Sequence, residues 1–195
     1  MAVVSIKNKL RRGNLLAGND PYIPTDFESI ATVSVGSGGA ANVEFTSIPG
    51  TYTHLQIRGI AKTTTSATKD FEVLYMRFNG DTGSNYAFHV LVGSGTSATA
   101  GNGVNQSLMF GPYASKSGLA DAFAGTVMDI LDYANTNKYK TARILTGIDM
   151  NGVGEFAFQS GLWRNTNAIT SITIYPNANN IAQYSTFALY GIKGA

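Results

Sequence analysis

The chain has 195 residues, which suits one domain with a short extension better than two domains. Only 13% of the residues are charged and none is cysteine, so a disulfide framework and thiolate metal sites are excluded. The net charge is +2, and no run approaches the ~18 apolar residues of a membrane-spanning helix. We therefore expect a neutral, hydroxyl-rich domain that has no membrane as a partner.

Positive charge is concentrated in the first nineteen residues, which carry four basic side chains and no acidic one. The remainder has 10 basic against 12 acidic residues, a balance of −2. The domain behind this N-terminal arm thus lacks the basic footprint of a nucleic-acid-binding protein, and nucleic acid is not expected as a partner. Charges also interrupt the apolar residues of the arm, so no secretory signal peptide is predicted.

A short amphipathic helix is predicted within the arm. Ser5 can cap it, Ile6 and Leu10 share one face, and Gly13 follows as its end. Because a helix of two turns is marginal in water, we expect it to order only against a partner, with its basic residues meeting an acidic surface. The predicted docking residues are Ile6, Lys7, Lys9, Leu10, Arg11, Arg12, Leu15 and Leu16.

A stiff strap joins this arm to the domain. Pro21 and Pro24 force extended backbone on the residues before them, across residues 18–26. We therefore assign residues 1–26 to arm and strap, and residues 27–195 to a single domain. The alternative is a frayed terminus without a function.

Residues 51–62 form the strongest strand pattern and are expected at the centre of the fold. Leu55, Ile57 and Gly59 alternate with polar side chains, which is the period of a half-buried strand. Further strands are predicted at residues 28–35, 41–48, 70–78, 85–92, 104–110, 127–133, 140–149, 154–163, 168–175 and 186–193. Residues 70–78 are apolar on both faces, which indicates a central strand that is covered on both sides or lies at a subunit interface.

The segments between these strands are expected to be turns and loops. Residues 28–35 and 41–48 should pair as a hairpin around a glycine-rich turn, and residues 93–103 should form a flexible exposed loop. Residues 117–124 are the one interior segment that could be a short helix. Some ten strands without intervening helices predict an all-β fold, an antiparallel sandwich of jelly-roll or Greek-key type.

The sequence shows no catalytic, cofactor-binding or metal-binding pattern. His54 and His89 are the only histidines, and neither accompanies a nucleophile motif. Asp129 and Asp132 are three residues apart, which sends them to opposite faces of a strand. A turn rich in Asn and Asp at residues 79–85 lacks the acidic twelfth ligand of a calcium loop. We therefore expect a protein that is not an enzyme and has no cofactor.

Aromatic residues exceed what one core of this size must hide. Tyrosine and tryptophan can stack on sugar rings, anchor a subunit contact or fill a core, and core or interface is the default interpretation. The candidate contact residues for an interface or a glycan are Tyr75, Tyr86, Tyr113, Trp163 and Tyr175.

Several long blocks carry a resemblance to a known family. They read FESIATVSVGSGGAANVEFTSIPGTYTHLQIRGIAKT, MRFNGDTGSNYAFH, ILDYANTNKYKTARILTG, SGLWRNTNAITSITIYP and STFALYGIKGA. From residue 27 onward, the chain resembles a recurring domain of tailed-bacteriophage virion proteins. The resemblance implies a jelly-roll-like structural module located on the virion, with other virion proteins as partners and no catalytic residues.

The function expected from this resemblance is that of an accessory module anchored to the particle by its arm. It can be a tail adaptor, fibre or tip protein, or it can decorate the capsid. A homo-oligomer is expected from the surplus of apolar surface, and the resemblance implies a trimer. The alternative function is a carbohydrate-binding module for a host receptor or surface glycan.

Overall fold

The computed structural model describes residues 26–66, 71–118 and 120–194, and within these ranges it contains twelve strands and no helix. The strands are β1 (Phe27–Ser34), β2 (Val43–Phe45), β3 (His54–Ala61), β4 (Phe71–Phe78), β5 (Tyr86–Gly93), β6 (Ala98–Gln106), β7 (Met109–Ser115), β8 (Ala124–Leu131), β9 (Lys140–Asp149), β10 (Gly154–Trp163), β11 (Ile172–Pro176) and β12 (Thr186–Ile192). The predicted docking residues of the arm lie outside the described residues.

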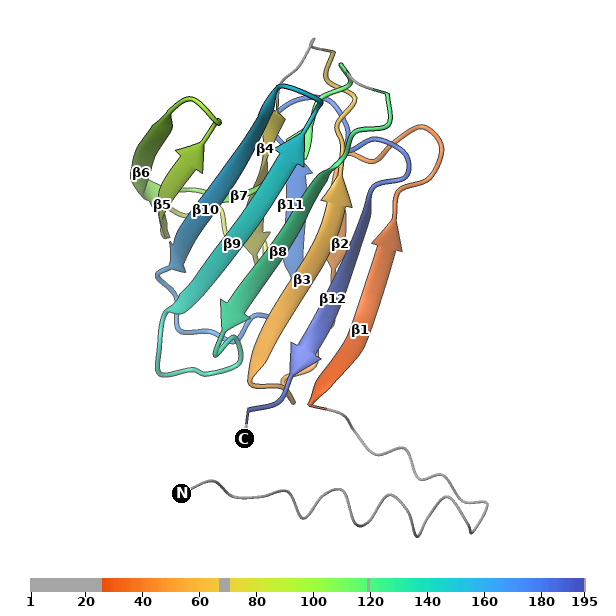
Figure 1. Cartoon of the computed structure of the whole chain (residues 1–195). Coiled ribbons are helices and arrows are strands. Elements are labelled where there is room, and N and C mark those ends of the chain that lie inside the picture. Colours follow the sequence, from red (N-terminus) through yellow and green to blue (C-terminus); the bar gives the residue numbers. More distant parts are fainter. Residues whose placement is uncertain (1–25, 67–70, 119, 195) are drawn as a thin grey trace, which may run out of the picture.

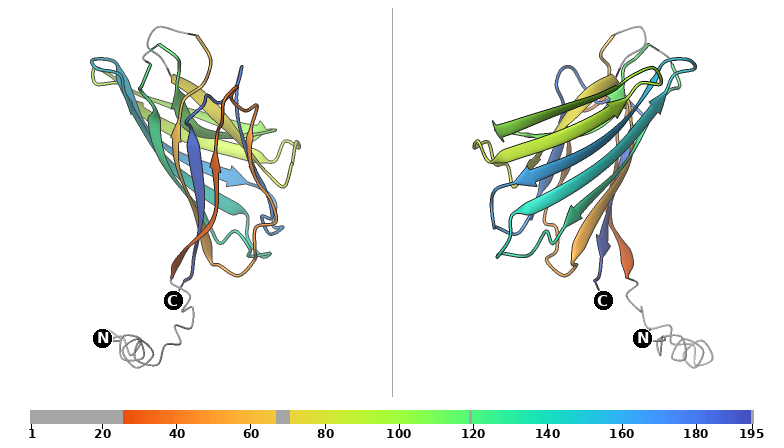
Figure 2. Two further views of the ribbon diagram at one scale, coloured as in Figure 1. Left: turned by 90° about the vertical axis from the view of Figure 1, so that its right-hand side faces the viewer. Right: turned by 60° about the vertical axis from the view of Figure 1, so that its left-hand side comes forward.

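The strands form two antiparallel sheets that pack face to face (Figure 1). The large sheet has eight strands in the order β1-β12-β3-β8-β9-β10-β5-β6, and the small sheet has four in the order β2-β11-β4-β7. This confirms the predicted all-β sandwich. The large sheet twists, so that the β5–β6 ribbon lies at an angle to β1 and β12 (Figure 2), as expected from the right-handed twist of strands.

The strand predicted at the centre of the fold, β3, lies inside the large sheet between β12 and β8. Leu55 and Ile57 are fully buried, as their alternation predicts. Gly59 points to the same inner side, where a Cβ atom would lie 2.7 Å from the ring of Phe187. The glycine therefore makes room for an aromatic ring on the neighbouring strand.

The core between the sheets is built from the inner sides of both sheets. On β4, Leu74, Met76 and Phe78 have no exposed surface, and on β9 Ala142 and Ile144 are equally buried. Transfer of such side chains from water contributes roughly 1.5–3 kcal/mol each, which makes this layer the main source of stability. As predicted, β4 is a central strand of its sheet, since it pairs with β11 and β7.

A fully buried lysine near the β8–β9 connection links two loops at one end of the sandwich. The Nζ of Lys140 donates hydrogen bonds to the backbone oxygens of Asn135, Lys138 and Thr166, at 2.5, 2.8 and 3.0 Å. Burial lowers the pKa of Lys140, and nearby Asp132 opposes this effect. Three carbonyl dipoles thus take the place of water around a buried ammonium group.

Three predictions about local structure are wrong. Strand β1 pairs with β12 in the large sheet and β2 pairs with β11 in the small one, so residues 28–48 form no hairpin. Residues 98–106, assigned in part to a flexible loop, form edge strand β6, which pairs with β5. The described residues of 117–124 are turns and the beginning of β8, with no helical turn.

Candidate interaction surfaces

The two histidines of the described chain lie far apart on the large sheet. Within the described ranges, no group of three or more metal-ligating side chains is found. His54 on β3 and His89 on β5 are separated by four strand spacings, or roughly 19 Å along the sheet. His54 accepts a hydrogen bond from the backbone N–H of Asp132 at 3.0 Å, which gives it a structural role in the turn after β8.

Hydrogen bonds of the Asp81 side chain hold the turn at residues 79–85 in place. Asp81 accepts hydrogen bonds from the Trp163 indole at 2.7 Å, from Asn85 at 2.9 Å and from the backbone of Gly83 at 2.7 Å. Burial alone would raise the pKa of Asp81, but these three donors together lower it. The carboxylate therefore ties the turn to β10.

Two of the five predicted contact residues lie in the core. Tyr86 is fully buried and Trp163 is 1% exposed, and their rings stack 6.4 Å apart between the sheets. The Tyr86 hydroxyl accepts a hydrogen bond from the backbone of Phe78 at 3.0 Å. In the described chain both rings therefore belong to the core, and neither presents a face on the surface.

The other three predicted contact residues lie together on the outer side of the small sheet. We call this the aromatic face; it consists of Phe71, Tyr75, Phe110, Tyr113 and Tyr175. Its rings contact one another: Phe71 stacks on Tyr113 at 4.4 Å, and Tyr75 lies 6.0 Å from both Phe110 and Tyr175. Edge-to-face and stacked pairs of this kind stabilise a sheet beyond the area that they bury.

Charged side chains also lie against the aromatic face and at its end. The Arg77 guanidinium lies 5.1 Å from the centre of the Tyr175 ring, which is a cation–π contact. Glu72 is 6% exposed and accepts hydrogen bonds from the Thr65 hydroxyl at 2.5 Å and the Ala178 backbone at 2.7 Å. Burial, reinforced by the nearby Glu155 carboxylate, raises the pKa of Tyr113 to about 12.

A groove of about 270 Å³ remains at one end of the aromatic face. Phe71, Tyr75 and Phe110 form its apolar side, and Thr65, Lys116 and Asn177 are among its polar lining. Aromatic rings beside hydroxyl, amide and ammonium groups are the surroundings in which a sugar ring can bind.

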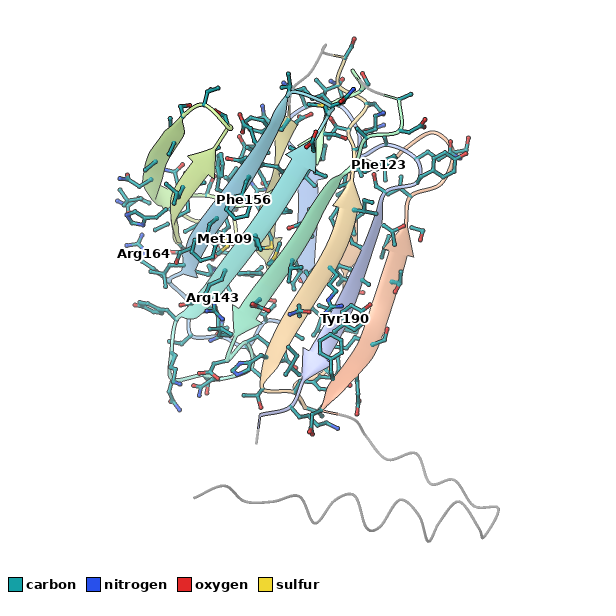
Figure 3. All side chains as sticks on the ribbon, in the orientation of Figure 1. Met109, Phe123, Arg143, Phe156, Arg164 and Tyr190 are labelled. Carbon is teal, nitrogen blue, oxygen red and sulfur yellow. The ribbon has the colours of Figure 1, made fainter. Side chains whose placement is uncertain are left out.

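The outer side of the large sheet is different, because its large apolar side chains stay between about a third and a half exposed in the described chain. We call it the open face; its members are Ile60, Leu91, Val127, Leu145, Phe156 and Phe158. The alternation along β9 and β10 explains their position, since Ala142, Ile144 and Ala157 point into the core and their neighbours point out. Figure 3 looks onto this face and labels Phe156 on it.

Strand register brings the members of the open face side by side. Val127, Leu145, Phe158 and Leu91 are directly paired across β8, β9, β10 and β5. Their exposed fractions lie between 37% and 52%. With Ile60 and Phe156, these side chains leave on the order of 500 Å² of apolar surface on one face, near the upper end of what monomers expose.

Charged side chains border the open face without entering its centre. The Arg143 guanidinium lies 3.8 Å from the Asp129 carboxylate on the paired strand, and both are adjacent to the apolar row. Arg58 stands at the end of that row, but its guanidinium lies over the rings of Phe27 and Tyr190, at 5.3 and 5.8 Å, on the β1 side. The centre of the open face is therefore uncharged.

The fold is a β-sandwich whose two outer faces differ in how far their large apolar side chains are exposed. Within these residues, no helix has the length and apolar character needed to cross a membrane. Comparisons of the chain with protein-family models, with curated proteins and with solved structures found no match.

Proposed function

We propose that the protein is a non-enzymatic structural component of a tailed-bacteriophage particle. In this proposal it binds its neighbours in the particle through the open face and through the N-terminal arm. The observation that carries the proposal is the open face, because exposed contiguous apolar surface of this size is typical of a protein-binding site. The resemblance of residues 27–195 to phage virion domains is the reason for proposing a tailed-bacteriophage particle.

The geometry of the domain is compatible with two attachment points. The backbone N–H of Lys193 donates to the carbonyl of Asp26 at 2.9 Å, so the chain enters the sandwich where β12 ends (Figure 1). This place is on the β1–β12 side of the large sheet, whereas the open face is centred on β9 and β10. The open face and an arm that joins the domain at Asp26 can therefore bind two different neighbours in an assembly.

The test is incorporation into particles. Phe158→Glu places a charge at the centre of the open face and should lower the amount of protein in purified particles at least about tenfold, because a buried unpaired charge is strongly unfavourable. Tyr139→Glu is the matched control, since Tyr139 is 54% exposed in the β8–β9 connection, away from the open face. Quantitative mass spectrometry of particles would contradict the proposal if wild-type protein is absent, or if both variants incorporate like wild type.

The second candidate function is carbohydrate binding, and the groove of the aromatic face favours it. Tyr75 lines the groove and is partly exposed. A glycan array probed with the full chain should then give signals that Tyr75→Ala removes and Phe158→Glu retains. A blank array with wild-type protein would argue against this candidate and leave the structural role unaffected.

A further inference from the structure

The open face contains a depression that is defined by two glycines. Gly125 on β8 and Gly147 on β9 are directly paired, and a Cβ atom built on either would meet nothing within 4 Å. The residues paired on either side are Ile60 on β3 and Phe156 on β10. We call this depression the glycine slot; the two residues that flank it are three strand spacings, or roughly 14 Å, apart in the sheet.

Phe156 is a protruding ring immediately beside the glycine slot. It is 52% exposed, and among the ring–ring and cation–π contacts of the described residues it takes part in none. A phenylalanine side chain is of the size that a slot between two large apolar neighbours can receive. The open face therefore presents a knob and a hole side by side.

We infer that the open face pairs with the same face of a second copy of this chain, with Phe156 of each copy in the glycine slot of the other. This inference rests on the proposed function, because it uses the same open face as a binding surface. It adds that the partner bound there is a second copy of the chain. In a two-fold interface, a patch must be complementary to itself: if one residue contacts another across it, the reverse contact is also made. A knob and a hole on one face satisfy that requirement.

The charges around the face also suit self-association. A face whose charges all had one sign would repel the same face of a second copy. Here Asp129 and Arg143, at the border of the face, carry opposite charges and pair with each other. Arg58 is directed toward Phe27 and Tyr190, away from the centre. Two copies can therefore approach without bringing like charges together in the apolar centre.

The size of the surface is consistent with a stable pair. The apolar part, on the order of 500 Å², together with a polar border, approaches the ~800 Å² per partner of a standard interface. A trimer expected from the phage resemblance would need two different complementary patches on each copy, because a cyclic contact with three copies is heterologous. Knob and hole lie on one face, so we propose a dimer in place of the trimer.

The first experiment measures the mass of the full chain in solution by sedimentation from roughly 1 to 100 μM. Wild type should be a dimer, and Gly147→Leu should weaken dimerisation at least about tenfold by filling the slot. Gly50→Leu is the matched control, since Gly50 also has open space around it but lies in the β2–β3 connection. Phe156→Ser removes the knob and should weaken dimerisation even if Gly147→Leu fails to fold.

The absence of native cysteine allows a second, positional test. Copies carrying Phe156→Cys, mixed with copies carrying Gly147→Cys, should be joined by a bismaleimide crosslinker of about 10 Å, because the two positions meet across the interface and face-to-face sheets pack ~10 Å apart. Phe156→Cys mixed with Gly50→Cys should not.

The outcomes separate this inference from the proposed function. Monomeric wild type, a trimer mass, or undiminished dimerisation in both Gly147→Leu and Phe156→Ser would overturn the pairing. If wild type is monomeric but Phe158→Glu still blocks incorporation into particles, another virion protein occupies the open face. In that case the proposed function stands and this inference fails.

Discussion

The outer sides of both sheets carry large apolar side chains, but the two sides differ in whether these side chains are covered or exposed. On the aromatic face, the rings stack on one another and Arg77 covers one of them. On the open face, Phe156 and Phe158 point outward from β10 and are about half exposed. The difference teaches that a surplus of aromatic residues does not itself mark a binding site; the contacts among them decide whether they stabilise the domain or remain available to a partner.

Among substitutions on the two faces, Tyr113→Ala is expected to have the largest effect on the free energy of unfolding. Tyr113 is 3% exposed and stacks on Phe71, so its removal leaves a cavity on the aromatic face. We expect the free energy of unfolding to fall by about 3–5 kcal/mol, as for other buried aromatic truncations. Urea denaturation measures it, and a loss below about 1 kcal/mol would mean that the aromatic face is as open as its counterpart.

A smaller loss of folding stability is expected at alkaline pH, where Tyr113 ionises. The pKa of Tyr113 is raised to about 12, chiefly by burial, whereas an unfolded tyrosine titrates near 10. Because the folded pKa is the higher one, the stabilisation is complete below pH ~10 and is lost as the pH rises through ~12, by up to about 3 kcal/mol.

Tyr113→Phe should reduce that alkaline loss, and unfolding curves at several pH values between roughly 9 and 12 would show it. Tyr86, whose pKa burial also raises to about 12, should account for a remaining part of the loss. An unchanged pH profile in Tyr113→Phe would show that this phenol ionises equally easily in both states.

On the open face, removing an aromatic ring should lower the free energy of unfolding only slightly. Phe158 is 47% exposed, so Phe158→Ser should change the free energy of unfolding by about 1 kcal/mol or less, measured at low protein concentration. The comparison with Tyr113→Ala is direct, because both changes remove an aromatic ring from an outer sheet side. Equal destabilisation by the two variants would contradict the assignment of one side as closed and the other as open.

The smallest effect should be a gain in stability. Gly125 lies in β8 with open space around it, so Gly125→Thr adds a β-branched side chain without a clash. We expect about 0.5–1 kcal/mol of added stability, from the lower entropy of the unfolded chain and the better strand propensity. Thermal unfolding at a protein concentration low enough to keep the chain monomeric measures this gain, because filling the slot would also weaken the proposed dimer. A lower melting temperature of the monomer would mean that the slot is already filled within it.

Strands with strict alternation and a buried inner side could be predicted from the sequence. The predicted ranges 140–149 and 154–163 match the bounds of β9 and β10. Residues 98–103 of edge strand β6 were assigned to a loop, because their glycines and small polar residues carry no period and their order comes from the pairing of β6 with β5. The partner of β1 was also missed, since β12 lies more than 150 residues away and no local pattern encodes that choice.

The candidate site was less predictable for a related reason. Alternation in β10 separates Phe156 and Phe158 from Ala157 and Gln159, but it does not say which set is buried. In the structure, the smaller set faces the core, where the Gln159 amide donates to the Gly111 carbonyl at 2.9 Å beneath β7. Size and apolarity alone would have placed the two phenylalanines inside.

The attachment of β1 has a mechanical consequence. Within the large sheet, β1 is an edge strand that pairs with β12 alone, in an antiparallel register from Phe27 with Ile192 to Ser34 with Thr186. A pull applied at Asp26 along the strand axis loads the hydrogen bonds of this pair together, in shear, because they lie across the direction of force. A pull applied sideways, away from β12, would instead break them one after another. A domain tethered through its N-terminal end should therefore resist tension along β1 better than tension that peels this strand from the sheet, and single-molecule force measurements with the two pulling directions would show the difference.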